Sequence, residues 1–351
     1  MLHRPRAHNS SEVSVRGPHV LAFCTTIASP GLQPIARQVR KATFDFEGVR
    51  PTYAGLNGVA DAVAAMTNLE ELTLLGMPDR DTDGWVLRGA SFRLRLFMTT
   101  LSLTSKDVLD FLRSQPNITT LATISPLPPD MSTKNVYQHM SFPTDAVPRL
   151  TTLDCSAPFL ISLQAASPPT RALTNMRVDL NRLNPNIESE ALKALAAFSS
   201  SVKRLSLRRS ALRQQPASGD RSGAMSMATV LNHAAPNRRW SKVEFLEMHD
   251  GTYDASAIPS LSQSISKGFP AVETVVWAPS THPSGSTASA ACIAMIFFTF
   301  CRRLHHFIFL DDASDPANKR YLSVSKHSGG GLRAVPIGAA EVEDMWKQSP
   351  A

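Results

Sequence analysis

The chain is 351 residues long and carries a formal net charge of +7, with 43% hydrophobic and 19% charged residues. Such a composition supports a sizeable core and excludes a disordered polyampholyte. Runs of Lys and Arg never exceed two residues. Because nucleic-acid-binding proteins concentrate basic residues on one face, the sequence argues against nucleic acid as a partner.

The N-terminal segment, residues 1–18, is polar and basic, and we expect it to be disordered. Over residues 19–312 a short pattern then returns ten times: an aliphatic residue, an apolar residue three places on, and usually another at five, as in Leu69-x-x-Leu72-x-Leu74. The motifs are spaced by 23 to 41 residues and begin at Val39, Leu69, Leu94, Ile118, Leu150, Leu173, Val202, Val243, Val272 and Leu304. A recurrence of this length predicts a stacked repeat protein.

Each motif predicts a short strand, and apolar stretches between the motifs predict helices at 56–66, 188–198, 224–234, 257–267 and 288–301. Parallel strands need a crossover of about a dozen residues or more, which these spacings supply. We therefore expect an α/β solenoid over 19–312, of about ten irregular units. It should be curved, with parallel strands on the concave side and helices on the convex side. The longest unit contains a polar insertion, 213–223, whose role the sequence leaves open.

The C-terminal segment, 313–351, breaks the pattern. Tyr321–Val324 and Leu332–Val335 flank the glycine-rich Ser328–Gly331 and predict a hairpin, which a helix over 339–346 follows. We expect this segment to form a cap, because a cap covers the exposed edge of the last repeat.

The candidate binding residues follow from the alternation of side chains along a strand. Positions three, five and seven of each motif face away from the helices and should line the concave side. Arg and aromatic residues are favoured anchors at interfaces. The candidates for protein binding are Arg177, Arg204, Arg208, Phe245, Glu247, His249 and His306. An ordinary mixed surface remains the alternative interpretation.

The cysteines and the hydropathy of the sequence indicate the cellular compartment. Cys24, Cys155, Cys292 and Cys301 are scattered and form no Cys-x-x-Cys pair, which favours a reducing compartment. The strongest apolar stretch, 288–301, is 14 residues long, whereas a helix that spans a bilayer needs about 20. We expect an intracellular protein, cytoplasmic or nuclear, without a membrane partner.

Motifs for chemistry are missing from the sequence. It contains no nucleophile elbow and no phosphate-binding loop. His305 and His306 are adjacent on a predicted strand, so they face opposite sides and cannot readily chelate one ion. We expect no catalytic, cofactor or metal site and no enzymatic activity. Two alternatives stay open: an enzyme on a doubly wound α/β sheet, and a basic surface for RNA or DNA.

The Leu-x-x-Leu-x-Leu strands resemble leucine-rich repeats. Longer stretches, 92–121, 147–163 and 302–346, are similar to the leucine-rich-repeat region of F-box-type proteins from mushroom-forming fungi. That resemblance implies a repeat scaffold that holds an unidentified target protein, as the substrate-recognition part of a ubiquitin-ligase adaptor. In that family an F-box docks onto a Skp1-type adaptor. The Leu-Pro pair and Cys-x-x-Trp that mark an F-box are missing from the first 60 residues, so it was lost or lies upstream of Met1.

Overall fold

The computed structural model describes residues 11–77, 81–103, 105–123, 142–165, 172–180, 185–209, 226–235, 240–250, 255–279, 290–312, 319–327 and 331–347. The chain divides into two compact units. The first unit consists of Met1–Cys155 and Ala165–Arg171. The second unit consists of Ser156–Gln164 and Ala172–Ala351. The predicted insertion 213–223 lies outside the described residues.

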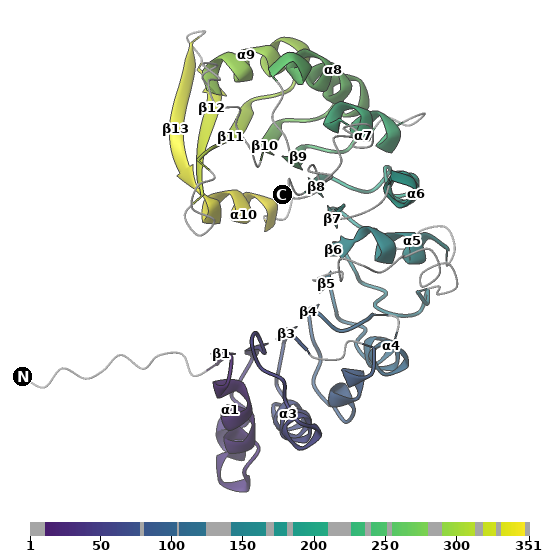
Figure 1. The fold of residues 1–351 in the computed structure, drawn as a ribbon, viewed down its shortest axis with the longest axis vertical. Helices are drawn as coiled ribbons and strands as arrows, with labels where there is room; N and C mark the ends of the chain where they lie inside the picture. The colour runs from purple at the N-terminus through teal and green to yellow at the C-terminus, as the bar shows by residue number, and fades with distance from the viewer. Residues whose placement is uncertain are drawn as a thin grey trace, which may run out of the picture. The chain divides into compact units, whose positions relative to one another are not determined.

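Strands follow one another in chain order within each unit (Figure 1). In the first unit they are β1 (Glu12–Arg16), β2 (Lys41–Asp45), β3 (Glu71–Leu75), β4 (Leu96–Thr99), β5 (Thr120–Thr123) and β6 (Thr152–Ser156). In the second they are β7 (Asn175–Asp179), β8 (Arg204–Arg208), β9 (Phe245–Asp250), β10 (Thr274–Pro279), β11 (His306–Asp312), β12 (Arg320–Lys326) and β13 (Leu332–Gly338). The pairs β1–β2 to β5–β6 and β7–β8 to β10–β11 are parallel.

Helices connect the strands. In the first unit they are α1 (His19–Ile27), η1 (Pro30–Leu32), α2 (Gln33–Ala36), α3 (Tyr53–Ala65), η2 (Asp83–Leu87) and α4 (Lys106–Arg113). Later in the chain come α5 (Ala157–Ala165), α6 (Pro185–Ala196), α7 (Met227–Ala234), η4 (Ala255–Ala257), α8 (Ile258–Gly268), α9 (Ala290–Phe300) and α10 (Ala339–Lys347). Figure 1 shows α1, α3 and α4 along one side of the first unit's strands, and α7, α8 and α9 along one side of the second unit's strands.

A repeated hydrogen bond sets the register between neighbouring repeats. The carbonyl oxygen at motif position two accepts from two successive backbone N–H groups of the next repeat. The Arg40 carbonyl accepts from Glu70 and Glu71 at 2.8 and 3.0 Å, and the Glu244 carbonyl accepts from Glu273 and Thr274 at 2.8 and 3.0 Å. This bond recurs in both units, so each strand begins at the same level as its neighbour.

The core lies between the strands and the helices. Positions one, four and six of the motif point into it, and they are almost completely buried, as Leu69, Leu72 and Leu74 show in β3. Because the register keeps equivalent positions opposite one another, Leu72 lies beside Ala42 on one neighbouring strand and Phe97 on the other. Each repeat therefore buries its apolar side chains against the next, as stacked repeats require. Positions three, five and seven form the opposite side, which we call the strand face.

Every motif predicted as a strand is one: the ten motifs coincide with β2 to β11. The α/β repeat architecture is therefore confirmed. The doubly wound alternative is wrong for the described strands, because their order never reverses within a unit and such a fold needs a switch point.

The predicted disorder of residues 1–18 is wrong for residues 12–16, which form β1. Val13 pairs with Ala42, and Val15 pairs with Phe44, so both valines occupy motif positions four and six. Position one falls on Ser10, and without an aliphatic residue there the pattern is not recognisable. The repeats thus begin before residue 19.

The C-terminal segment departs from the repeats. β12 pairs antiparallel with β11, and β13 pairs antiparallel with β12, so the hairpin covers the edge of the last parallel strand. The helix α10 then begins directly after β13. Figure 1 shows α10 on the other side of the strands from α7, α8 and α9.

We predict that Leu72→Ala lowers the free energy of unfolding by about 2–5 kcal/mol, because Leu72 is fully buried and truncation leaves a cavity between sheet and helices. Urea denaturation measures the loss. The control is the neighbouring Thr73→Ala on the strand face, where we expect a change below about 1 kcal/mol. Equal losses for the two variants would contradict the assignment of the two faces.

Candidate protein-binding surface

The strand face of the second unit carries the candidate residues in three rows across the sheet. Asn175, Arg204, Phe245, Thr274 and His306 pair in order along the first row. Arg177, Ser206, Glu247, Val276 and Ile308 form the second row, and Asp179, Arg208, His249 and Ala278 form the third. The sequence placed all seven candidates on this face, and the register brings them together.

The helix α10 lies on this face. Val342 and Trp346 of α10 pack into one buried cluster with Phe245, Val276, Ala278, Ile308, Leu310 and Tyr321. The rings of Phe245 and Trp346 have their centroids 6.3 Å apart. The apolar part of the strand face is therefore covered by an amphipathic helix of the same chain, which buries Trp346 to 3% exposure.

Charged contacts fix the same helix. The Arg177 guanidinium donates two hydrogen bonds to the Glu343 carboxylate of α10, at 3.2 and 2.8 Å, and lies 4.7 Å from the centre of the Trp346 ring. Arg177 also pairs with Glu247 at 3.5 Å. Strands are about 4.8 Å apart, so Arg177 and Glu247, two strands apart, meet only because the residue between them is the small Ser206. Arg204 donates to the backbone carbonyl of Met345.

The surroundings of Glu247 and Glu343 shift the pKa values of both carboxyl groups. Burial acts to raise the pKa of Glu247, but the hydrogen bond and charge of His249, followed by the charges of Arg177 and Arg208, outweigh it, so the pKa lies far below its ordinary value. Burial likewise acts to raise the pKa of Glu343, but the hydrogen bond and charge of Arg177 outweigh it, and the pKa is lowered. Both groups therefore stay ionised where α10 docks.

Tyr321 of β12 borders this cluster. Burial, followed by the charge of Glu247, raises the pKa of Tyr321 to about 12. Its hydroxyl therefore stays neutral beside the two carboxylates.

Exposure differs strongly among the candidates. Arg177, Phe245 and Glu247 lie on the expected face of the strands but are buried there. Arg204, Arg208 and His249 are half-buried, and His306 is exposed at the first row. The reason is α10, which the sequence analysis placed at the end of the solenoid rather than on its strand face.

Sequence reasoning missed Val342, Glu343 and Trp346 as partners of this face. A signal was present: these residues form one stripe at helical spacing, apolar at both ends and acidic between. The pattern predicts that the helix packs on something, but not on which surface.

The strand face of the first unit has a different composition. Lys41, Glu71, Leu96 and Thr120 form one row across β2 to β5. The Lys41 ammonium lies 3.5 Å from the Glu71 carboxylate, which also pairs with Arg95. Leu75, Leu96 and Met98 are all half-buried, so apolar side chains remain accessible among the charges. This face offers accessible apolar side chains beside charged ones.

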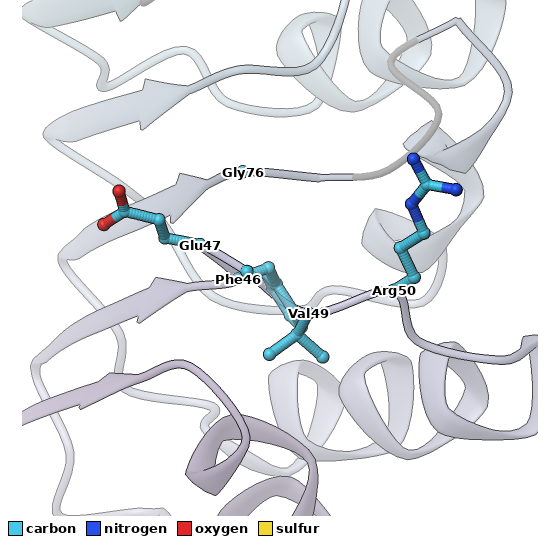
Figure 2. A pocket seen from close by; sticks show the side chains of 6 residues that line it. Phe46, Glu47, Val49, Arg50 and Gly76 are labelled. Atoms are coloured by element: carbon cyan, nitrogen blue, oxygen red, sulfur yellow. The ribbon is translucent and has the colours of Figure 1, made fainter.

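A hollow of about 410 Å³ follows the ends of β2 and β3, lined by Phe46, Glu47, Gly48, Val49, Arg50 and Gly76 (Figure 2). Gly76 has a φ of +67°, and a Cβ there would lie 3.0 Å from the backbone nitrogen of Glu47, so the loop after β2 requires this glycine. Figure 2 shows Glu47 and Arg50 extending to opposite sides. Their charges do not converge on a ligand.

Groups for other chemistry do not gather in the described part of the chain. Among those residues, no three His, Cys, Asp or Glu side chains are placed to hold a metal ion. Over the same residues, no helix is long and apolar enough to cross a membrane. Cys24, Cys155 and Cys301 are buried. Burial raises the pKa of Cys24 to about 12, and it raises the pKa of Cys301 to about 11 against the opposing charge of Lys326.

The repeat geometry defines the class: an α/β solenoid of the leucine-rich-repeat type, with strands in chain order and helices on one side of each unit. No protein-family model matches the sequence, and no curated protein does. Among solved structures the chain is similar to the leucine-rich repeat-containing protein LegL7 from Legionella pneumophila, with a TM-score of 0.48 and 12% identity. That alignment covers 85% of this chain and 96% of the other.

We predict that acid releases α10. A carboxyl whose pKa is lowered in the docked state stabilises docking fully above its ordinary pKa of 4.5, and this contribution is lost as the pH falls through the lowered value. Fluorine NMR of the chain labelled with 5-fluorotryptophan should show the Trp346 signal change at acid pH before those of the buried Trp240 and Trp277.

The matched variant is Glu343→Gln, which cannot ionise. It should weaken docking at neutral pH and shrink the pH dependence of the Trp346 signal. If the acid transition of Trp346 were the same in both chains, Glu343 would not be the group that holds α10.

Proposed function

We propose that the chain is a protein-binding repeat scaffold that holds its partners on the strand face. The observation that carries this proposal is the docking of α10. An amphipathic helix already lies on this face through a buried Trp346, a bidentate Arg177–Glu343 pair and the apolar Phe245. These are the residue types that dominate protein interfaces. A face that binds one helix in this way is suited to bind proteins.

The strand face of the first unit is accessible. It presents the half-buried Leu75, Leu96 and Met98, together with the charges of Lys41 and Glu71. Apolar side chains together with charged residues are the general composition of an interface. A protein partner is favoured over a small ligand, because this surface spans several strands and the charges of the hollow in Figure 2 do not converge.

The seven sequence candidates belong to the same proposal. Arg177, Arg204 and Phe245 contact α10, and Glu247 pairs with Arg177. Arg208, His249 and the exposed His306 lie on the same strand face. We assign them to protein binding in the second unit. Nothing in their arrangement favours a catalytic role over this one.

A finer assignment rests on the sequence resemblance to F-box-type leucine-rich-repeat proteins. On that ground we propose that the scaffold is the substrate-recognition part of an intracellular ubiquitin-ligase adaptor, cytoplasmic or nuclear. The Skp1-type adaptor would then be held by an F-box segment encoded upstream, and the repeats would hold the target.

We predict that the double variant Leu96→Glu, Met98→Glu loses its protein partners, because two new carboxylates must be desolvated in the centre of the contact. For each partner, the double variant should bind at least about tenfold more weakly than the unaltered chain. The measurement is quantitative mass spectrometry of proteins captured from the source organism's extract by the tagged chain.

The control is Ile35→Glu, which places the same charge at an apolar side chain that is 47% exposed and lies outside the strand face. It should capture the same proteins as the unaltered chain. Loss of the same partners in both variants would place the binding surface elsewhere.

The adaptor assignment has its own test. The chain extended by its upstream coding sequence should co-elute with a Skp1-type adaptor in size-exclusion chromatography, whereas residues 1–351 alone should not. If the extended chain fails to bind the adaptor, the ligase assignment is overturned and the scaffold proposal remains.

A further inference from the structure

The helix α10 contacts the strand face through one stripe only. Val342, Glu343, Met345 and Trp346 touch it, while Glu341, Asp344 and Lys347 are exposed. An amphipathic helix that lays one stripe into a groove is a general mode by which proteins bind peptides. The contact between α10 and the strand face therefore has the form of a complex between a receptor and a helical ligand.

The contact is incomplete on the receptor side. Several buried polar atoms of the same face have no hydrogen-bond partner in the described part of the chain: Asn175 Oδ1, Ser206 Oγ, Arg204 Nε and Arg208 Nε. All four belong to β7 and β8, the strands that carry the arginines. A ligand with more polar atoms than α10 at this position would satisfy groups that α10 leaves unpaired.

The helix α10 is not part of the core that lies between the strands and α7, α8 and α9. The strand before it, β13, lies at the sheet edge, and nearly all its side chains are exposed. β13 is held by its pairing with β12, and α10 begins directly after Gly338. Release of α10 exposes the buried apolar cluster but leaves the core between the strands and α7, α8 and α9 intact.

Charge and shape define what else fits. Arg177, Arg204 and Arg208 make one end of the face basic, and Phe245, Val276 and Ile308 make the other end apolar. We propose that this face is a helix-binding site that α10 occupies within the chain, and that an acidic amphipathic helix of a partner protein, with an aromatic residue three places after a carboxylate, displaces it. This inference rests on the proposed function and specifies its partner in the second unit.

The test uses the full chain and a fluorescent peptide of residues 336–351. In the double variant Glu343→Lys, Trp346→Ala the chain's own helix loses both anchors, so the face should be free. The peptide should bind this variant at least about tenfold more tightly than the unaltered chain, in which α10 competes. Fluorescence anisotropy measures both affinities.

The matched control is Asp344→Lys, a charge reversal on the exposed side of the same helix. The chain with this substitution should bind the peptide as weakly as the unaltered chain. Equal affinity of the peptide for the unaltered chain and for the double variant would overturn the helix-binding site, as would failure to bind the double variant while circular dichroism shows it folded.

A second measurement avoids any variant. Excess peptide added to the unaltered chain should accelerate amide hydrogen exchange in α10 but not in α7, because only α10 is displaced. If exchange in α10 stays unchanged at saturating peptide, α10 is a fixed part of the fold and the proposal fails.

The partner class is tested separately. A peptide of unrelated sequence that keeps only the spacing apolar–Glu–x–x–Trp should bind the double variant within about tenfold of the natural peptide. If it does not bind, the site accepts α10 alone and the partner part is overturned. None of these results depends on Leu96 or Met98, so failure here is distinguishable from failure of the scaffold proposal.

Discussion

The structure depends on one repeated interaction, the backbone hydrogen bonds from each repeat to the carbonyl at position two of the preceding one. These bonds hold successive strands at the same level, as between Arg40 and Glu70 and between Glu244 and Glu273. Equivalent apolar positions then stack without offset, and each repeat completes the core of its neighbour. A slip by one residue would turn every leucine of the core to the strand face.

The same constraint gives the strand face its chemistry. The backbone register fixes positions three, five and seven in rows, so long side chains from different strands can meet above a small one, as Arg177 and Glu247 meet above Ser206. In the second unit these rows hold α10. In the first unit they remain partly accessible, with the Lys41–Glu71 ion pair next to Leu96. The same backbone pattern thus supports two strand faces of different composition, because the two units carry different side chains at the same motif positions.

The local sequence pattern predicted most of the strands and the face on which each side chain lies. Where it failed, particular residues explain the failure. Leu69, Leu72 and Leu74 define a strand by their spacing alone, as do the equivalent residues of the other nine motifs. β1 was missed because Ser10 stands where the pattern needs an aliphatic residue, although Val13 and Val15 fill the other two positions. The alternation rule also placed Arg177 and Phe245 on the correct face. It could not show that they are buried there.

The sequence by itself determined the repeats, the two faces and the stripe on α10, because each follows from the period of side chains along one element. Only the tertiary structure decided that this stripe packs on the strand face of β7 to β11 and not on the end of the stack. That choice depends on contacts between residues far apart in the chain, such as Arg177 and Glu343, which are 166 positions apart. The spacing of residues within one element cannot predict such a contact, because the contact depends on the shape and charge of two surfaces that form only when the chain has folded.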